Sequence, residues 1–160
     1  FKRDNLNKER ELWTNIIEKT PITCLYSNKR IQPNNFELDH FIPWSFVCHN
    51  QPWNLTPVLP EINSSKSNCL PHTKYISPFI HQQTLFLKES RDLLSPPQWH
   101  KLIEPYVVSL KIEETALLNE KTVKKALLNT LRPLIFLAQQ AGFQSQWVYK
   151  QPQGEFRKIS

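Results

Sequence analysis

The side chains best suited to chemistry lie in one short block of the chain. Asp39 and His40 are adjacent, Asn54 follows His40 after fourteen residues, and Asn63 follows Asn54 after nine. Carboxylate and amide oxygens are hard ligands that suit Mg²⁺, and a histidine that is mostly neutral at pH 7 can accept a proton from water. We therefore predict that Asp39 and Asn63 hold one divalent cation, and that His40 is the general base in the hydrolysis of nucleic acid.

The elements expected around this block must bring these side chains together. Strands are predicted around residues 35–39 and 55–59, which places Asp39 and His40 at the end of the first strand. Successive residues of a strand point to opposite faces, so we expect a twist or bulge to let both side chains approach one phosphate. Asn63 falls in the first turn of a short predicted helix, where an asparagine can alternatively serve as a cap.

Residues 24–71 resemble an HNH (ββα-metal) endonuclease domain, most closely the HNH domains of RNA-guided CRISPR effectors and related bacterial nucleases. The pattern of that family reads Asp-His-Ile-Val/Ile-Pro, then Asn-x-x-x-Leu, then Asn-x-x-Lys-Ser and a closing Pro. The counterparts in this chain are Asp39, His40, Pro43, Asn54, Asn63, Lys66, Ser67 and Pro71, and the stretch from Cys24 to Lys29 is similar to the turn before the first strand. The resemblance implies a small ββα-metal core, products with 3′-hydroxyl and 5′-phosphate ends, and target choice by a guide RNA, a fused domain or a partner.

The resemblance also assigns roles to individual residues. Asn63 stands where many members have His, and this variation occurs among CRISPR-type members and favours Mg²⁺ or Mn²⁺ over a softer metal. Asn54 is counted with the catalytic residues, although we expect it to hold the loop and backbone near His40 rather than to touch substrate. Lys66 is expected either to bind a substrate phosphate or to pair with a carboxylate. Glu61 is a second-choice metal ligand.

The composition favours a polyanionic partner. Twenty Lys and Arg against fourteen Asp and Glu give a net charge of +6, and the pI is near 9.3. We expect the partner to be nucleic acid, with DNA as the substrate; the alternative is a solvated basic surface. The only two glycines, Gly142 and Gly154, exclude a glycine-rich phosphate loop.

The start of the chain and its hydropathy suggest where the protein works. The sequence has no apolar run of about 18 residues and no signal-like start, so we expect no membrane span and a cytoplasmic location. The chain contains no Met and begins with Phe1. We therefore expect a segment of a longer bacterial defence or CRISPR-type protein, with further domains or subunits outside it.

Three cysteines allow two interpretations. Cys24, Cys48 and Cys69 are too few for a four-thiolate zinc site, and none has a Cys partner at the usual spacing. A mixed site that adds His49 or His72 is the alternative. We expect three reduced, mostly buried thiols instead, and no structural zinc.

The sequence predicts an α+β fold in three segments. Residues 1–21 form an N-terminal helix that packs on the core, residues 22–76 form the nuclease core, and residues 77–160 form a mainly α-helical C-terminal extension. The first helix is predicted from Asn5 to Thr20, with Asp4 or Asn5 as its cap.

The C-terminal extension should contain three helices. The first begins at Ser77-Pro78 and the second at Ser95-Pro96, with Pro105 as an interruption. The third runs from Glu113 or Asn119 to Ala141 and ends at Gly142. Residues 144–160 either add a short strand or stay mobile.

The third helix of the extension carries a basic stripe. Lys121, Lys125 and Arg132 project within about 40° of one another, with Lys124 on the shoulder. The stripe should face outward, either toward substrate phosphates or simply toward solvent. The apolar residues of this helix that should face the core are Leu127, Leu131, Leu134, Leu137 and Ala138.

Two other functional classes stay open. The same fold could serve as a catalytically silent platform that binds nucleic acid, although such a platform needs none of Asp39, His40 and Asn63. Alternatively, the helical extension could dock the chain onto a larger complex.

Overall fold

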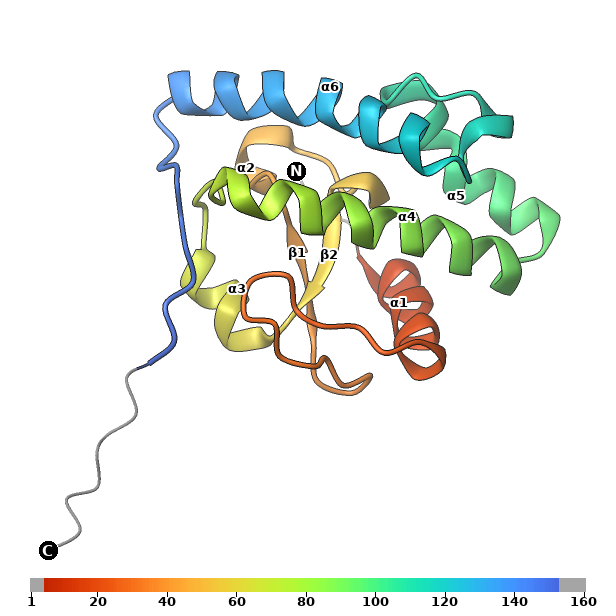
Figure 1. Cartoon of the computed structure of the whole chain (residues 1–160), viewed down its shortest axis with the longest axis horizontal. Coiled ribbons are helices and arrows are strands. Elements are labelled where there is room, and N and C mark those ends of the chain that lie inside the picture. The colour runs from red at the N-terminus through yellow and green to blue at the C-terminus, as the bar shows by residue number, and fades with distance from the viewer. Residues whose placement is uncertain (1–4, 153–160) are drawn as a thin grey trace, which may run out of the picture.

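The computed structural model describes residues 5–152 of the chain. A two-stranded hairpin lies among helices, which makes the fold α+β (Figure 1). In chain order the elements are α1 (Asn7–Lys19), β1 (Glu37–His40), α2 (Trp44–Val47), the 3₁₀ turn η1 (Pro52–Asn54), β2 (Leu55–Val58), α3 (Pro60–Lys66), η2 (Thr73–Tyr75), α4 (Ile76–Leu93), α5 (Pro96–Ser109), η3 (Glu114–Ala116) and α6 (Glu120–Gln140).

The hairpin and the short helix after it form the expected ββα core. β1 and β2 are antiparallel, with Glu37 opposite Val58 and His40 opposite Leu55. α3 packs against β1, and α4 packs against β2. The pairing continues without a break over all four positions, so the bulge considered for the end of β1 is absent.

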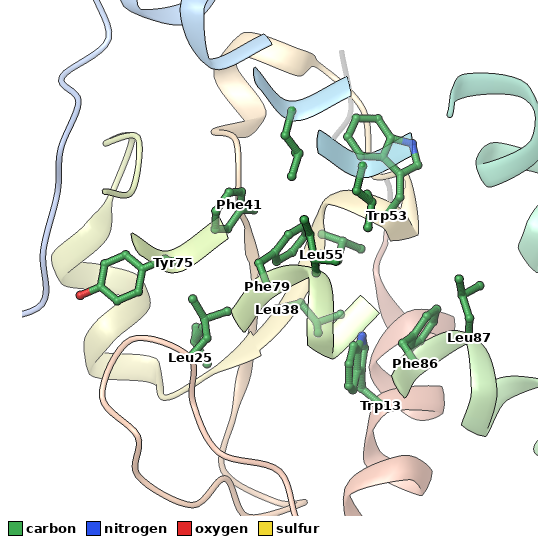
Figure 2. Packing of buried hydrophobic residues seen from close by; sticks show 14 of the residues in the cluster. Trp13, Leu25, Leu38, Phe41, Trp53, Leu55, Tyr75, Phe79, Phe86 and Leu87 are labelled. Atoms are coloured by element: carbon green, nitrogen blue, oxygen red, sulfur yellow. The ribbon is translucent and has the colours of Figure 1, made fainter. Parts of the chain in front are cut away.

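Aromatic side chains join the hairpin and α1 to the long helix α4 (Figure 2). Phe41, just after β1, stacks on Phe79 of α4 with the ring centroids 4.2 Å apart. Trp13 of α1 stacks on Phe86, about two turns further along α4, with the ring centroids 4.8 Å apart. The buried apolar cluster includes residues from α1, the hairpin and the helices after residue 76. Packing therefore crosses both predicted segment boundaries.

Buried hydrogen bonds also tie the helical extension to the core. Gln83 of α4 donates from Nε2 to the carbonyl oxygens of Pro52, at 3.1 Å, and Leu55, at 2.8 Å. Its Oε1 accepts a hydrogen bond of 2.6 Å from the hydroxyl of Tyr106 in α5. Burial raises the pKa of Tyr106 well above its ordinary value, so this donor keeps its proton. α4 and α5 thereby hold the chain where it enters β2.

The observed helix ends differ from the predicted ones in informative places. α1 begins two residues later than predicted, and the Asn5 side chain accepts a hydrogen bond from the backbone N–H of Asn7; the alternative cap Asp4 lies outside the described residues. The predicted interruption at Pro105 is wrong, because α5 continues through it to Ser109. A proline removes one helical hydrogen bond, but Ile103 and Tyr106 on either side are buried and hold the helix together.

The last helix and the segment after it complete the fold. Asn119 caps α6, so the later of the two predicted starts is the observed one. Residues 144–149 then run back along the core, where the N–H of Trp147 bonds to the carbonyl of Leu70 at 3.0 Å and its carbonyl accepts from the N–H of His72 at 2.8 Å. Residues 153–160 lie outside the described part. None of the described helices is long and apolar enough to cross a membrane.

Candidate active site

β1 directs two neighbouring polar side chains to different partners. Asp39 and His40 are its last two residues, and their exposed fractions are only 3% and 5%. Asp39 contacts α3 and the turn around residue 26, whereas His40 contacts the loop between α2 and η1. The regular register keeps the alternation of faces expected for a strand.

Two buried donors hold the carboxylate of Asp39. Lys66 Nζ lies 3.0 Å from Asp39 Oδ1 and 2.8 Å from the carbonyl oxygen of His40. The hydroxyl of Tyr26 donates to Asp39 Oδ2 at 2.9 Å. Burial raises the pKa of Tyr26 well above its ordinary value, and the adjacent Asp39 carboxylate raises it further. Tyr26 therefore stays protonated and keeps donating to Asp39.

A second carboxylate lies on the same face of β1, one pleat before Asp39. Glu37 precedes Asp39 by two residues, and residues two apart share a face of a strand. Asn63 of α3 donates from Nδ2 to Glu37 Oε2 at 2.7 Å. Both side chains are only partly buried, so a small ligand can reach this pair from solvent.

The loop of residues 48–51 meets His40. Asn50 Oδ1 lies 2.8 Å from His40 Nε2. The next residue, Gln51, accepts hydrogen bonds through Oε1 from the indole N–H of Trp53 and, at 2.7 Å, from the hydroxyl of Ser109 in α5. The helical extension thus fixes the loop that reaches the histidine.

His49 in the same loop is held as a neutral imidazole. Its Nδ1 accepts a hydrogen bond of 3.2 Å from the backbone N–H of Gln51, and its ring lies against Trp53. Burial lowers the pKa of His49, against a smaller opposing effect of a backbone hydrogen bond. His49 therefore supports the loop and adds no positive charge to it at neutral pH.

Asn54 fastens the chain immediately after the candidate base. It is completely buried. Its side chain accepts from the N–H of Ile42 and donates to the carbonyl of Ile42, both at 2.9 Å. Its own carbonyl accepts from the N–H of Phe41 at 2.9 Å. These three bonds fix the backbone of residues 41–42, and no atom of Asn54 faces solvent.

The remaining predicted site residues fall in two different environments. Lys66 is fully buried and paired with the carboxylate of Asp39, which is one of the two partners considered for it, and its ammonium does not reach the protein surface. Lys121, Lys125 and Arg132 are exposed on α6, which packs on α4. Glu61 is exposed on α3.

The apolar face predicted for α6 is correct except at one position. Leu127, Leu131 and Ala138 are buried and Leu134 is partly buried. Leu137 is 54% exposed instead. It lies one residue before Ala138, and the 100° step per residue turns it away from the core.

The expectation that the three thiols are mostly buried is wrong, because only one of them is buried. Cys24 is buried, but Cys69 is only partly buried and Cys48 is exposed, and all three are free thiols. Cys48 has a φ of 55° and ends α2 in the left-handed conformation. Within residues 5–152 no three His, Cys, Asp or Glu side chains are grouped closely enough to hold a metal ion.

Three residues that contact the candidate site residues were not predicted from the sequence. Glu37 carried a usable signal, because it shares the strand period of Asp39. Tyr26 and Asn50 carried none, because a tyrosine in a turn and an asparagine in a loop are common. Their roles depend on tertiary contacts across 13 and 10 residues of chain, respectively.

Comparison with known families identifies the core. Residues 24–72 match the family described as HNH endonuclease, so this part of the chain is an HNH domain. The match covers the segment from the turn that carries Tyr26 to the residue before η2. No curated protein and no solved structure matches the chain.

Proposed function

From the premise that residues 24–72 form an HNH domain, we propose that the chain is a metal-dependent endonuclease that hydrolyses phosphodiester bonds of DNA. His40 is the general base, and Asp39 and Asn63 hold one Mg²⁺ or Mn²⁺ ion. Tyr26, Lys66 and Asn54 position these groups rather than contact the substrate.

The observation that carries the proposal is the meeting of β1 and α3. Asp39 and Glu37 on β1 face Asn63 and Lys66 on α3, which lie one helical turn apart. His40 follows directly at the end of the strand. One strand and one short helix bring the carboxylates of Glu37 and Asp39 to the side chains of Asn63 and Lys66, while the side chain of His40 lies on the other face of β1 against Asn50.

The oxygen atoms of Asp39, Glu37 and Asn63 support the binding of a hard divalent cation by their chemistry. Mg²⁺ is typically bound by one or two carboxylates, with water and substrate oxygens completing its shell. Each carboxylate oxygen has two acceptor positions, so the bonds from Lys66 and Tyr26 leave Asp39 a further acceptor position on each oxygen. Asn63 uses its amide nitrogen toward Glu37, which leaves the amide oxygen as a ligand. Glu37 is then available as an additional carboxylate.

The chain's own residues would divide the chemistry as follows. His40 takes a proton from a water molecule while the water oxygen forms a bond to phosphorus. The bond between phosphorus and the 3′ oxygen breaks, and that oxygen leaves with a proton from solvent. A bound divalent cation would neutralise the negative charge that develops on the phosphate and on the leaving oxygen. Asn54 keeps the backbone after His40 in place throughout.

The choice of DNA and of a larger parent protein rests on charge and on family resemblance. The net charge of +6 favours a polyanion, and an HNH core contains few groups that could read base sequence. We therefore propose that further domains or partners, as in bacterial defence or CRISPR-type proteins, select the target.

One observation favours the second candidate, a catalytically silent platform. Asp39 and His40 are almost completely buried, and both oxygens of Asp39 already accept hydrogen bonds. A platform would keep this network for stability alone. Both candidates bind nucleic acid, but only the endonuclease cleaves it.

Incubation with supercoiled plasmid, linear duplex and single strands distinguishes the two. An endonuclease should cleave the supercoiled plasmid in the presence of Mg²⁺ or Mn²⁺, and EDTA should stop the cleavage. Binding without cleavage under every metal condition would support the silent platform.

A further inference from the structure

A groove outside the HNH domain runs between the beginning of α4 and most of the length of α6, from Lys124 to Gln139. Its volume is about 460 Å³, and the two helices lie side by side there (Figure 1). Apolar side chains that include Ile80 and Leu128 line it, and Lys124, Arg132 and Phe136 of α6 also contribute to its wall.

The groove is positively charged. Lys124 and Arg132 are its charged lining residues, and no Asp or Glu contributes to it. Neither cation takes part in an ion pair with any residue of the described range 5–152. Glu120, the first residue of α6, is the only acidic residue of this helix. It lies one turn before Lys124 but forms no ion pair with it or with Arg132.

An aromatic side chain also lines the groove, one helical turn beyond Arg132. Phe136 is 59% exposed, which is unusual for a large apolar side chain. It follows Arg132 by one helical turn, and Arg132 follows Lys124 by two turns, or about 12 Å. At roughly 3.4 Å per nucleotide, that distance corresponds to three or four nucleotides of a stacked strand.

We propose that this groove binds single-stranded nucleic acid. Lys124 and Arg132 contact phosphates, and Phe136 stacks on a base. Proteins that hold single strands without sequence preference combine a cationic groove with aromatic platforms in this way. A duplex would offer the phosphates but not the face of a base, so Phe136 favours the single strand.

A nucleic acid fits the groove better than a protein helix does. Lys124 and Arg132 would both be covered by an occupant, and burying two cations is costly unless each meets an opposite charge. A strand supplies one negative charge per nucleotide, whereas an apolar helix or a second copy of this surface supplies none. The proposal deepens the endonuclease function, on which it rests, by naming where a strand is held beyond the HNH domain.

The groove pairs the cations differently from the stripe predicted from sequence. Arg132 shares the groove with Lys124, whereas Lys125 lines a separate hollow of about 670 Å³ on the other flank of α6. That second hollow also contains Glu113. The stripe of Lys121, Lys125 and Arg132 thus remains a competing prediction that the same experiment can test.

The test is fluorescence anisotropy with a labelled single strand and a duplex of the same sequence, in EDTA so that no cleavage occurs. Phe136→Ala should weaken single-strand binding about tenfold and leave duplex binding nearly unchanged. The double variant Lys124→Ala/Arg132→Ala should lower the slope of log affinity against log salt by roughly 1.4. All three side chains are exposed on α6, so circular dichroism should show an unchanged fold.

Matched control variants distinguish phosphate binding in the groove from a general effect of positive charge on the surface. Lys88→Ala/Lys101→Ala removes two exposed cations from α4 and α5 outside the groove, and the salt slope should stay as in the unmodified protein. Unchanged affinity and slope in the groove variants would overturn the proposal. A loss of affinity in Lys121→Ala/Lys125→Ala instead would assign phosphate binding to the stripe.

Two further outcomes also count against the groove. If the unmodified protein does not bind the single strand, the proposal is wrong even where plasmid cleavage depends on His40. If Phe136→Ala abolishes self-association in sedimentation while nucleic-acid affinity is unchanged, the groove is an interface with a second copy of the chain and does not bind nucleic acid. The plasmid-cleavage assay tests the endonuclease proposal separately in each case.

Discussion

Lys66 and Asp39 form an ion pair inside the protein, with Nζ 3.0 Å from Oδ1 and side-chain exposures of 0% and 4%. The ammonium also bonds to the carbonyl of His40, and Tyr26 holds the other oxygen of the carboxylate. Each charged group is therefore matched by a partner, which is the condition for tolerating charge at such a depth. Lys66 thereby connects α3 to the side chain of Asp39 and to the backbone of His40.

Breaking this pair should destabilise the fold. Lys66→Met removes the ammonium and leaves Asp39 buried without its counter-charge, so the free energy of unfolding should fall by about 3–5 kcal/mol. Urea denaturation followed by circular dichroism measures this change. The double variant Lys66→Met/Asp39→Asn should recover part of the loss, because neither charge is then left unpaired. A cost below about 1 kcal/mol for the single variant would contradict the pairing.

Asn54→Ala should also destabilise the protein, through the backbone rather than through a charge. The N–H and C=O of Ile42 would both lose their partner in a fully buried place, at a cost of about 1–3 kcal/mol per orphaned group. Asn68 is exposed on the loop after α3, and Asn68→Ala is the matched control. Equal stability of the two variants would remove the structural role assigned to Asn54.

The positions of the candidate catalytic residues could be predicted from sequence because they follow from local spacing. Asp39, His40 and Asn63 lie on elements whose positions follow from alternation and a short helix, and all three fall within residues 24–72, which match the HNH endonuclease family. The start of α5 was equally readable, since Ser95 and Gln98 form a reciprocal cap.

Other features depended on contacts that no local pattern contains. The donation from Tyr26 to Asp39 and the bond from Asn63 to Glu37 join residues 13 and 26 positions apart. The continuation of α5 through Pro105 depends on tertiary packing of its neighbours, which outweighs a local propensity of about 3 kcal/mol. The division of the α6 cations between two hollows depends on where α4 lies.

Stability should decline at alkaline pH because of two buried tyrosines. Burial raises the pKa of Tyr26 and of Tyr106 above the ordinary value. Above about pH 10 the tyrosines of the unfolded chain lose protons that the folded state retains, so unfolding becomes easier as pH rises. The contribution of the two protonated tyrosines to stability is complete below about pH 10. It is lost as the pH rises through their raised pKa values in the folded protein.

Tyr106→Phe tests this pH dependence. The variant removes one of the two groups, so the fall in unfolding free energy should lessen by up to about 1.4 kcal/mol per pH unit. Urea denaturation at a series of pH values above 10 provides the slope. An identical slope in the variant and the unmodified protein would mean that Tyr106 ionises equally in both states.

Metal binding should depend on the residues between β1 and α3. Calorimetric titration with Mn²⁺ should show affinity weakened about tenfold or more by Asp39→Asn and by Asn63→Ala. Glu37→Gln keeps an acceptor for Asn63 but removes the charge, so a weakened affinity would establish Glu37 as a further ligand. Glu61→Gln changes an exposed carboxylate on the same helix. If Glu61→Gln alone weakens binding, the proposed ligand set is wrong.

Single-turnover cleavage of plasmid in Mg²⁺ tests whether His40 is the general base of the proposed reaction. His40→Ala should cleave at least about 100-fold more slowly than the unmodified protein, with nucleic-acid affinity unchanged. His81→Ala, which removes an exposed histidine from α4, should cleave at the unmodified rate. Cleavage by His40→Ala at a rate close to that of His81→Ala would show that His40 is not the general base.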